Sequence, residues 1–309
     1  MKFTIIFLGI VMSILLAGCA KGPGPGEKAQ ETVSRFIYKD ASIAFREEGQ
    51  GPPVILLHGL GGAMYSWRYV VPALAPNYKV ITLDFKGFGL SDKPSDSDYS
   101  IQSHSEMVEA FIRERGYKDA TLIGNSMGGA VTLFTYLNCM RKPDNPIKKL
   151  VLIDSAAYRQ DIPPYIAFMR VPVLSTLYLY LVPTGIGSGF VLKIAYYDPK
   201  KIPEESITTY GGYLAMPGAR NALIKTSSQL IPENMDQLAE QYKSIDAPTL
   251  ILWGDHDRIV PLWVGKKLSW DIPNSEMKII KNCGHIPQEE CPEEVIPAVR
   301  AFLAGQGKS

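Results

Sequence analysis

The chain has 309 residues, of which 46% are hydrophobic and 20% are charged, and its mean hydropathy is close to zero. This composition is ordinary for a globular protein, and the length allows one large domain or two small ones. Lysine and arginine (32 together) nearly balance aspartate and glutamate (31), and no stretch is strongly basic, which argues against a nucleic-acid partner.

The first residues have the layout of a secretory signal peptide. One cation, Lys2, precedes a mostly apolar run from Phe3 to Ala17, and small residues follow it. A membrane-spanning helix needs about 20 apolar residues, so a membrane anchor is the weaker alternative. We therefore expect residues 1–18 to be a signal peptide that is removed on export.

The end of that segment, Leu16-Ala17-Gly18-Cys19, resembles the lipobox of bacterial lipoproteins. The resemblance implies that Cys19 becomes the new amino terminus and is acylated, and several acyl chains give durable anchoring. The Gly- and Pro-rich polar residues 19–35 are typical of a flexible tether. We expect a lipid-anchored protein of the cell envelope. The anchor would be in the outer membrane if the organism has one, because Ala20 rather than aspartate follows the cysteine.

From residue 36 the sequence alternates short apolar runs with amphipathic ones. This pattern predicts an α/β fold, with a mostly parallel sheet of about eight strands flanked by helices. Continuous apolar runs such as VILLH and LVLID indicate strands that are buried on both faces. The expected strands are Phe36–Lys39, Ser42–Arg46, Val54–His58, Val80–Asp84, Thr121–Gly124, Leu150–Asp154, Thr249–Trp253 and Met277–Ile280. The expected helices span residues 66–75, 101–116, 127–140, 262–270 and 292–304.

The alternation stops between residues 158 and 238, where prolines and long apolar stretches replace it. This segment is predicted to be a helical cap inserted into a core of residues 36–157 and 239–305. Its apolar side chains include Tyr165, Phe168, Met169, Leu174, Leu177, Tyr178, Leu181 and Phe190. We expect part of this apolar surface either to pack on the core or to line a substrate cavity.

A serine lies between glycines in GNSMGG, residues 124–129, directly after the apolar run DATLI. A Gly-x-Ser-x-Gly match is weak evidence alone, but a strand, a sharp turn and a helix make up a nucleophile elbow. In such an elbow the strained turn lifts the serine hydroxyl clear of the backbone, and the glycines avoid clashes. The amino-terminal end of the following helix favours a developing oxyanion. Ser126 is therefore the candidate nucleophile.

A serine nucleophile requires a general base and an acid that orients it. His285, in the loop after the last expected strand, is the candidate base, whereas His104 and His256 are expected to be solvated. The acid is expected at the end of the preceding strand, where Asp255 and Asp257 compete. The chain order serine, acid, histidine is that of the nucleophile-elbow architecture.

The oxyanion donors are expected to be the backbone N–H of Met127 and one from the glycine-rich loop HGLGG at residues 58–62. The alternative interpretation, a phosphate-binding loop, lacks the Lys-Ser/Thr ending and the dinucleotide spacing. We expect no metal and no cofactor, because this chemistry requires neither. Cys283 and Cys291 flank the candidate base, and the sequence leaves open whether they form a disulfide or stay free and buried.

Five motifs, taken in this order, resemble the α/β-hydrolase family. They are HGLGG at 58–62, DFKGFGLSDKP at 84–94, GNSMGG at 124–129, WGDHDRIVP at 253–261 and CGHIPQEECPEEV at 283–295. The resemblance implies that Ser126 is the nucleophile, His285 the base and Asp257 the acid. It also implies that the N–H groups of Leu60 and Met127 form the oxyanion hole.

Between the two competing aspartates, the family spacing favours Asp257. In that spacing the aspartate stands three positions after a glycine and four positions before a proline. Asp257 stands in this way between Gly254 and Pro261. Asp154, which ends the strand before the insertion, corresponds to the acid of some relatives and is the weaker alternative. The glycines of DFKGFG are expected to shape a turn near the site.

A serine nucleophile argues against epoxide hydrolases and haloalkane dehalogenases, whose family pattern has a carboxylate there. The expected reaction is hydrolysis of a small-molecule carboxylic ester through an acyl-enzyme, by a carboxylesterase or lipase acting on uncharged short- to medium-chain acyl groups. One alternative is carbon–carbon hydrolysis of dienoic meta-cleavage products, since GNSMGG is common in that subfamily too. Its oxyanion loop usually contains Gly-Pro-Gly, whereas this one reads HGLGGAMYSW. Another alternative is a lipoprotein binding module without catalysis, against which the intact serine, aspartate and histidine argue.

Overall fold

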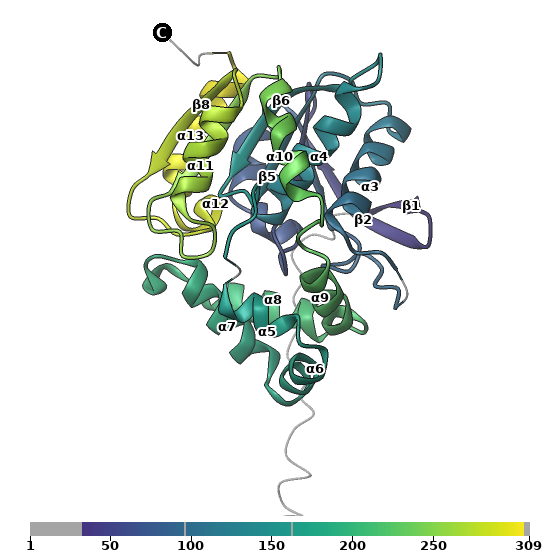
Figure 1. Cartoon of the computed structure of the whole chain (residues 1–309), viewed down its shortest axis with the longest axis vertical. Helices are drawn as coiled ribbons and strands as arrows, with labels where there is room; N and C mark the ends of the chain where they lie inside the picture. Colours follow the sequence, from purple (N-terminus) through teal and green to yellow (C-terminus); the bar gives the residue numbers. More distant parts are fainter. Residues whose placement is uncertain (1–32, 96, 162, 306–309) are drawn as a thin grey trace, which may run out of the picture. The chain divides into compact units, whose positions relative to one another are not determined.

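The computed structural model describes residues 33–95, 97–161 and 163–305 (Figure 1). The expected signal peptide (residues 1–18), the expected lipidation site Cys19 and most of the expected tether lie outside these residues. The first strand begins at Ser34, so the last two residues of the expected tether belong to the sheet instead.

One eight-stranded sheet forms the centre of the described chain, in the order β1-β2-β4-β3-β5-β6-β7-β8. The first two strands pair antiparallel with their neighbours, and all pairs from β3 to β8 are parallel. All eight expected strands are therefore confirmed. They are β1 (Ser34–Tyr38), β2 (Ala41–Glu48), β3 (Pro53–Leu57), β4 (Lys79–Leu83), β5 (Ala120–Asn125), β6 (Ile147–Ile153), β7 (Thr249–Gly254) and β8 (Ser275–Ile280).

Helices cover both faces of this sheet. They are α2 (Val70–Leu74), α3 (Ile101–Glu114), α4 (Met127–Met140), α11 (Leu262–Asp271), α12 (Pro287–Glu290) and α13 (Pro292–Leu303). The single helix expected at 66–75 is instead a 3₁₀ turn, η1 (Met64–Trp67), followed by the short α2. The sequence did not predict the short α12, because four residues are too few to show a helical period.

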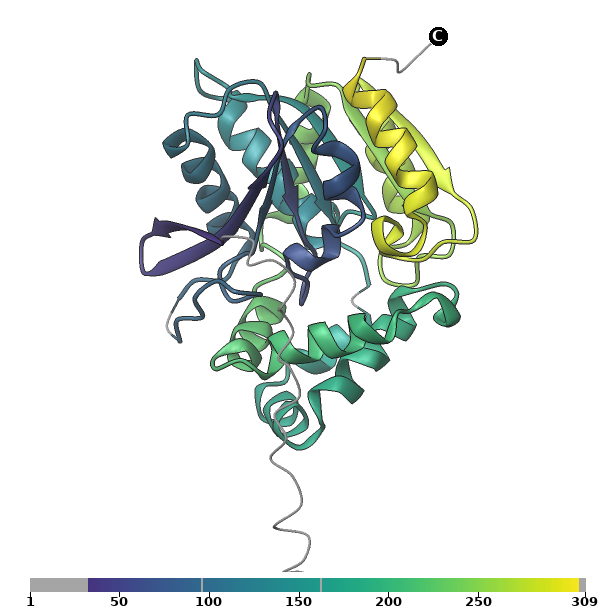
Figure 2. The same ribbon diagram turned by 180° about the vertical axis from the view of Figure 1, so that it is seen from behind.

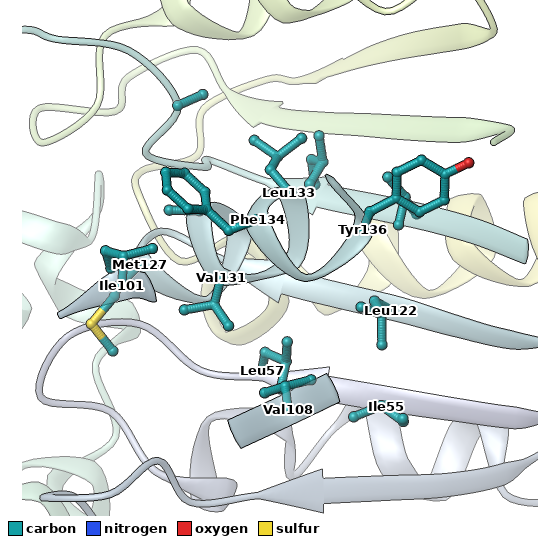
Figure 3. Packing of buried hydrophobic residues seen from close by; sticks show 14 of the residues in the cluster. Ile55, Leu57, Ile101, Val108, Leu122, Met127, Val131, Leu133, Phe134 and Tyr136 are labelled. Atoms are coloured by element: carbon teal, nitrogen blue, oxygen red, sulfur yellow. The ribbon is translucent and has the colours of Figure 1, made fainter. Parts of the chain in front are cut away.

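The parallel strands are buried on both faces, as their continuous apolar runs predict. Ile55 and Leu57 of β3 belong to a cluster with α3, α4 and α11, whereas Val54 and Leu56 belong to one with α2 and α13. Successive side chains of a strand point to opposite faces, so each strand contributes to both clusters. Figure 3 shows the first cluster, where side chains of α3 and α4 meet those of β3 and β5. This packing fixes the strand ends that carry the site.

Six α-helices are described between β6 and β7, and the first five of them gather at one end of the sheet in both views (Figures 1 and 2). These five are α5 (Pro164–Met169), α6 (Pro172–Leu181), α7 (Thr184–Ala195), α8 (Glu204–Ala215) and α9 (Ala219–Ser228), with the 3₁₀ turn η2 (Pro199–Lys201) between α7 and α8. The expected boundary at residue 238 falls within the next helix, α10 (Met235–Glu240), which precedes η3 (Gln241–Ser244). Met235 of α10 packs in the first sheet cluster.

In the described residues, no helix is by itself long and apolar enough to cross a membrane. The pair Val173–Leu181 and Thr184–Ala195 satisfies the length and composition criteria only when the two helices are taken together, and they meet at an angle of 111°.

Candidate active site

Ser126 lies at the turn between β5 and α4 with φ 55° and ψ −117°. A positive φ is unfavourable for a residue with a side chain, so neighbouring structure must hold the turn in place. The Ser126 N–H donates to the carbonyl of Ile153 at 3.0 Å, and its carbonyl accepts from the N–H of Ala156 at 3.1 Å. The end of β6 therefore fixes the serine from both sides, in the geometry of a nucleophile elbow.

The two glycines around Ser126 are required by close backbone approach. A Cβ on Gly128 would lie 2.1 Å from the carbonyl oxygen of Leu57, and one on Gly124 would lie 2.2 Å from that of Gly128. Atoms at those distances overlap, so any larger residue would push α4 away from β3 and β5. The spacing of GNSMGG thus follows from packing at this turn.

His285 and Asp257 form a buried pair at the ends of two neighbouring strands. The Nδ1 of His285 is 2.8 Å from Oδ2 of Asp257. The other oxygen of Asp257 accepts from the N–H groups of Ile259 (2.7 Å) and Val260 (3.0 Å). Since the carboxylate accepts a hydrogen bond from Nδ1–H, the neutral ring carries its proton on Nδ1. Nε2 of His285 then has no proton and can act as a base.

Asp255, the competing acid, is not near the imidazole of His285. Its carboxylate lies 2.6 Å from Nδ1 of His256 and 3.5 Å from Nζ of Lys281. The structure therefore brings Asp257, and not Asp255, to the candidate base. The catalytic roles of these residues stay predictions.

Asp154 is a third buried acidic side chain beside this pair. It directly follows β6, is fully buried, and its carboxyl group lies within 4.8 Å of the Asp257 oxygen and the His285 ring nitrogen. One of its oxygens accepts from the N–H of Gly254 at 3.0 Å. Burial and the adjacent carboxylate of Asp257 raise the pKa of Asp154 well above its usual range. A protonated Asp154 can donate its O–H to Asp257, which a second carboxylate cannot do.

We therefore predict that Asp154→Asn keeps whatever turnover the Ser126 site supports within about fivefold, because a neutral amide retains one acceptor for Gly254 and one donor for Asp257. Asp154→Leu, which has similar volume and neither group, should lower kcat by about 10- to 100-fold. Steady-state kinetics of both variants, with thermal unfolding as the folding control, measures this. If Asp154→Asn loses most of the activity, Asp154 acts as a charged group.

The expected oxyanion loop lies directly against the serine. A Cβ on Gly59 would be 3.2 Å from the Cβ of Ser126, and Leu60 and Met127 line the same cavity as Ser126. Within the described ranges, neither the Leu60 nor the Met127 N–H donates a hydrogen bond to the protein. Two free donors beside a nucleophile are what an oxyanion hole requires.

Sequence reasoning missed the residue that organises this loop, His58. Its Nδ1–H donates to the carbonyl of Gly59 at 2.8 Å, and its Nε2 accepts from the N–H of Phe85 at 3.0 Å. Burial lowers the pKa of His58 to about 4, so the ring is neutral and its tautomer is set by these two bonds. Its position at the end of a buried strand was the available signal.

The expectation that His104 is solvated is wrong. The ring is fully buried between Phe85 and Tyr99, and burial lowers its pKa to about 3. It lies three residues after Ile101 and four before Val108, on the apolar face of α3. That periodicity was the signal for burial. His256 is partly exposed, as expected.

A cavity of about 750 Å³ opens above Ser126 and His285. Its walls come from the strand ends on one side and from the insertion on the other, and most of them are apolar; Phe134, Tyr165, Phe168, Leu179 and Phe190 are examples. Tyr210 and Glu289 belong to its polar lining; Tyr210 donates to Glu289 at 2.6 Å, and Arg68 pairs with Glu289 at 2.6 Å. Leu174, Leu177 and Leu181 neither pack on the core nor line the cavity, and their side chains are exposed.

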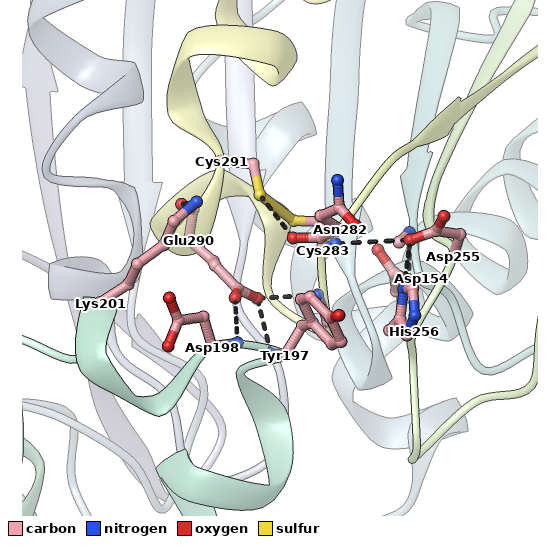
Figure 4. Close-up of a disulfide and its surroundings, with 12 residues drawn as sticks. Asp154, Tyr197, Asp198, Lys201, Asp255, His256, Asn282, Cys283, Glu290 and Cys291 are labelled. Atoms are coloured by element: carbon pink, nitrogen blue, oxygen red, sulfur yellow. Dashed lines mark hydrogen bonds and ion pairs between the residues drawn. A yellow bond between two sulfur atoms is a disulfide. The ribbon is translucent and has the colours of Figure 1, made fainter.

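The loop that carries His285 is joined to two other segments (Figure 4). A disulfide links Cys283 to Cys291, which answers the question that the sequence left open. The buried carboxylate of Glu290 accepts from the N–H groups of Gly284 (2.7 Å), Tyr197 (3.0 Å) and Asp198 (2.8 Å). Glu290 thereby ties the loop to the chain that follows α7.

Comparison with known proteins places these features among hydrolases. Residues 54–298 match the "Alpha/beta hydrolase family". The uncharacterized hydrolase YugF of Bacillus subtilis is 30% identical over 89% of this chain and 99% of its own length. A 2-hydroxy-6-oxo-6-(2'-aminophenyl)hexa-2,4-dienoic acid hydrolase of Metapseudomonas resinovorans is 30% identical over 90% of this chain and 93% of its own. The structure of a bacterial membrane phospholipase A is 26% identical with a TM-score of 0.71, over 90% of this chain and 87% of that one.

Proposed function

The chain belongs to the alpha/beta hydrolase family, and from this membership we propose that it hydrolyses carboxylic esters through an acyl-enzyme on Ser126. The observation that carries the proposal is the strained serine at the floor of an apolar cavity, which also holds a buried aspartate–histidine pair. In this proposal Ser126 Oγ attacks the ester carbonyl while Nε2 of His285 takes its proton. The N–H groups of Leu60 and Met127 stabilise the oxyanion.

The second half of the reaction reuses the same groups. The imidazolium of His285, stabilised by Asp257, gives its proton to the departing alcohol. Water then enters, His285 takes one of its protons, and the hydroxide equivalent attacks the acyl carbon. Collapse of the second tetrahedral intermediate releases the acid and returns the proton to Ser126.

The charge of the cavity supports an uncharged acyl group as substrate. The walls of the cavity are mostly apolar. The carboxylate of Glu289, which is one of the lining residues, is already paired with Arg68. An anionic substrate placed there would be desolvated near a second carboxylate. Among the lining residues in the described chain, Arg170 is the one arginine or lysine, and it is exposed at the end of α5. Each methylene of an acyl chain gains about 0.8 kcal/mol on burial.

Carbon–carbon hydrolysis of a dienoate is the second candidate, because the relatives favour it over ester hydrolysis. The Metapseudomonas protein is a dienoic acid hydrolase, and it aligns along nearly its whole length. The phospholipase similarity supports the ester reaction instead. Both reactions begin at a carbonyl carbon beside a serine, so the substrate distinguishes them.

We predict that kcat/KM for nitrophenyl esters rises by about tenfold from acetate to butyrate, since two buried methylenes contribute about 1.6 kcal/mol. Octanoate should also be turned over well, and the ratio of palmitate to octanoate turnover measures how long an acyl chain the cavity of about 750 Å³ accepts. The same preparation is assayed with 2-hydroxy-6-oxo-6-phenylhexa-2,4-dienoate. Turnover of the dienoate with no ester hydrolysis would replace the first candidate by the second.

We further propose that the chain is exported and anchored to an envelope membrane through acylated Cys19. The Leu16–Cys19 motif and the apolar run before it support this proposal. We predict that cells grown with an alkyne fatty-acid analogue label the wild-type protein and that Cys19→Ala abolishes the label. Cys139→Ala, which removes the buried free thiol, is the matched control and should label normally. Absence of label on the wild type would contradict the anchor.

A further inference from the structure

An apolar surface on the insertion is exposed to solvent. Nine of the thirteen large hydrophobic side chains that are exposed in the described chain lie between Val171 and Val191, on and beside α6 and α7. Val173 is 77% exposed and Leu181 is 72% exposed. We call this set the α6–α7 surface: Val171, Val173, Leu174, Leu177, Tyr180, Leu181, Ile186, Phe190 and Val191. Contiguous exposed apolar side chains mark a site of interaction.

The charge pattern around this surface indicates which partner fits it. Residues 171–192 contain no aspartate, glutamate, lysine or arginine. Arg170 and Lys193 stand at the two ends, both exposed, and neither forms an ion pair within the described ranges. An uncharged apolar face with cations at its margins suits the boundary of a phospholipid bilayer, where acyl chains meet phosphates.

The surface is continuous with the candidate active-site cavity. Tyr178 and Leu179 of α6 line the cavity, and Phe190 and Val191 of α7 both line it and are exposed. Figures 1 and 2 show α6 on the side of the insertion that faces away from the sheet. Two short helices meeting at 111° can lie along an interface. A bilayer on this surface would therefore meet the cavity wall.

We propose that the α6–α7 surface docks on the boundary between headgroups and acyl chains of an anionic phospholipid bilayer. Docking shortens the path by which the acyl ester of a membrane lipid enters the cavity; this second part rests on the proposed ester hydrolysis. A bilayer is favoured over a second copy of the chain because the surface has cations at both margins and no acid between them to pair with them.

The first experiment measures docking without catalysis, in the full-length chain carrying Ser126→Ala. A fluorophore is attached through Leu181→Cys or, as the matched control, through Ile37→Cys, which is 67% exposed on β1. Phosphatidylglycerol vesicles contain a lipid with a quencher in its acyl chain. We expect quenching at position 181 and little at position 37. Equal quenching at both positions, or none at 181, would overturn the proposal, as would self-association through position 181 in the absence of lipid.

The second experiment uses the active protein. Val173→Asp/Leu181→Asp should lower hydrolysis of a vesicle-embedded ester at least about tenfold, because charge is costly in the interface, and leave a soluble butyrate ester unaffected. Neither residue lines the cavity. Ile37→Asp/Trp270→Asp, at exposed positions outside the surface, is the control and should match wild type on both substrates. An equal loss on the soluble ester would overturn docking. Absence of all ester turnover would contradict the proposed function and leave the quenching result intact.

Discussion

Ser126→Ala is expected to lower kcat for ester hydrolysis by about a millionfold, the loss found when a serine nucleophile of such a triad is removed. The alanine fits the same turn, because Oγ makes no hydrogen bond within the described protein and the backbone bonds to Ile153 and Ala156 remain. Stability should therefore change little, so the loss would report chemistry. Steady-state kinetics on the butyrate ester, with thermal unfolding of the same sample, measures both.

A fluorophosphonate probe gives a second readout of this variant. The probe should label the wild-type chain on Ser126 and leave Ser126→Ala unlabelled, because it reacts only with an activated serine. Ser228→Ala, at an exposed position at the end of α9, is the matched control and should label like wild type. A folded wild-type protein that the probe does not label would favour the non-catalytic binding module.

The sheet was predictable from the sequence because each strand carries its own signal. Runs such as VILLH and TLILW are apolar at every position, and burial on both faces is the arrangement that such runs permit. The elbow was predictable because GNSMGG directly follows a strand pattern and precedes a helix pattern, although the contact that requires Gly128 is made with Leu57 of β3. A structural feature whose pattern lies within one short stretch of sequence can be predicted from that stretch.

Features that depend on distant segments were not predictable. Glu290 binds the backbone of Tyr197, 93 residues earlier, and nothing in its neighbourhood marks it as buried. The raised pKa of Asp154 comes from its burial and from the carboxylate of Asp257 beside it, and only the pairing of β6 with β7 brings these two side chains together. The exposed leucines of α6 have no local signal either. Their sequence predicts burial, and their position on the outer side of the insertion leaves them in solvent.

Asp257→Asn is expected to lower kcat by about 10⁴-fold, the effect of amidating the acid of a serine triad. The structure indicates why. Oδ1 of Asp257 accepts from the N–H groups of Ile259 and Val260, so the introduced amide must keep its oxygen there and turn its NH₂ toward His285. Nδ1 of His285 then accepts a hydrogen bond from this amide instead of donating one, which places the ring proton on Nε2. An imidazole with a proton on Nε2 cannot take the proton of Ser126.

Asp255→Asn is the matched control, one turn of the same loop away, and it should retain activity within about threefold, since the pairs it makes with His256 and Lys281 are partly exposed. Both variants should unfold at temperatures close to wild type, because the amide preserves volume and the two backbone hydrogen bonds of Asp257.

The decisive comparison is that of kcat/KM on the butyrate ester among the asparagine variants of the three aspartates. If Asp255→Asn costs more than Asp257→Asn, the assigned acid is wrong. If Asp257→Asn retains activity and Asp154→Asn loses it, the acid is Asp154, which directly follows β6.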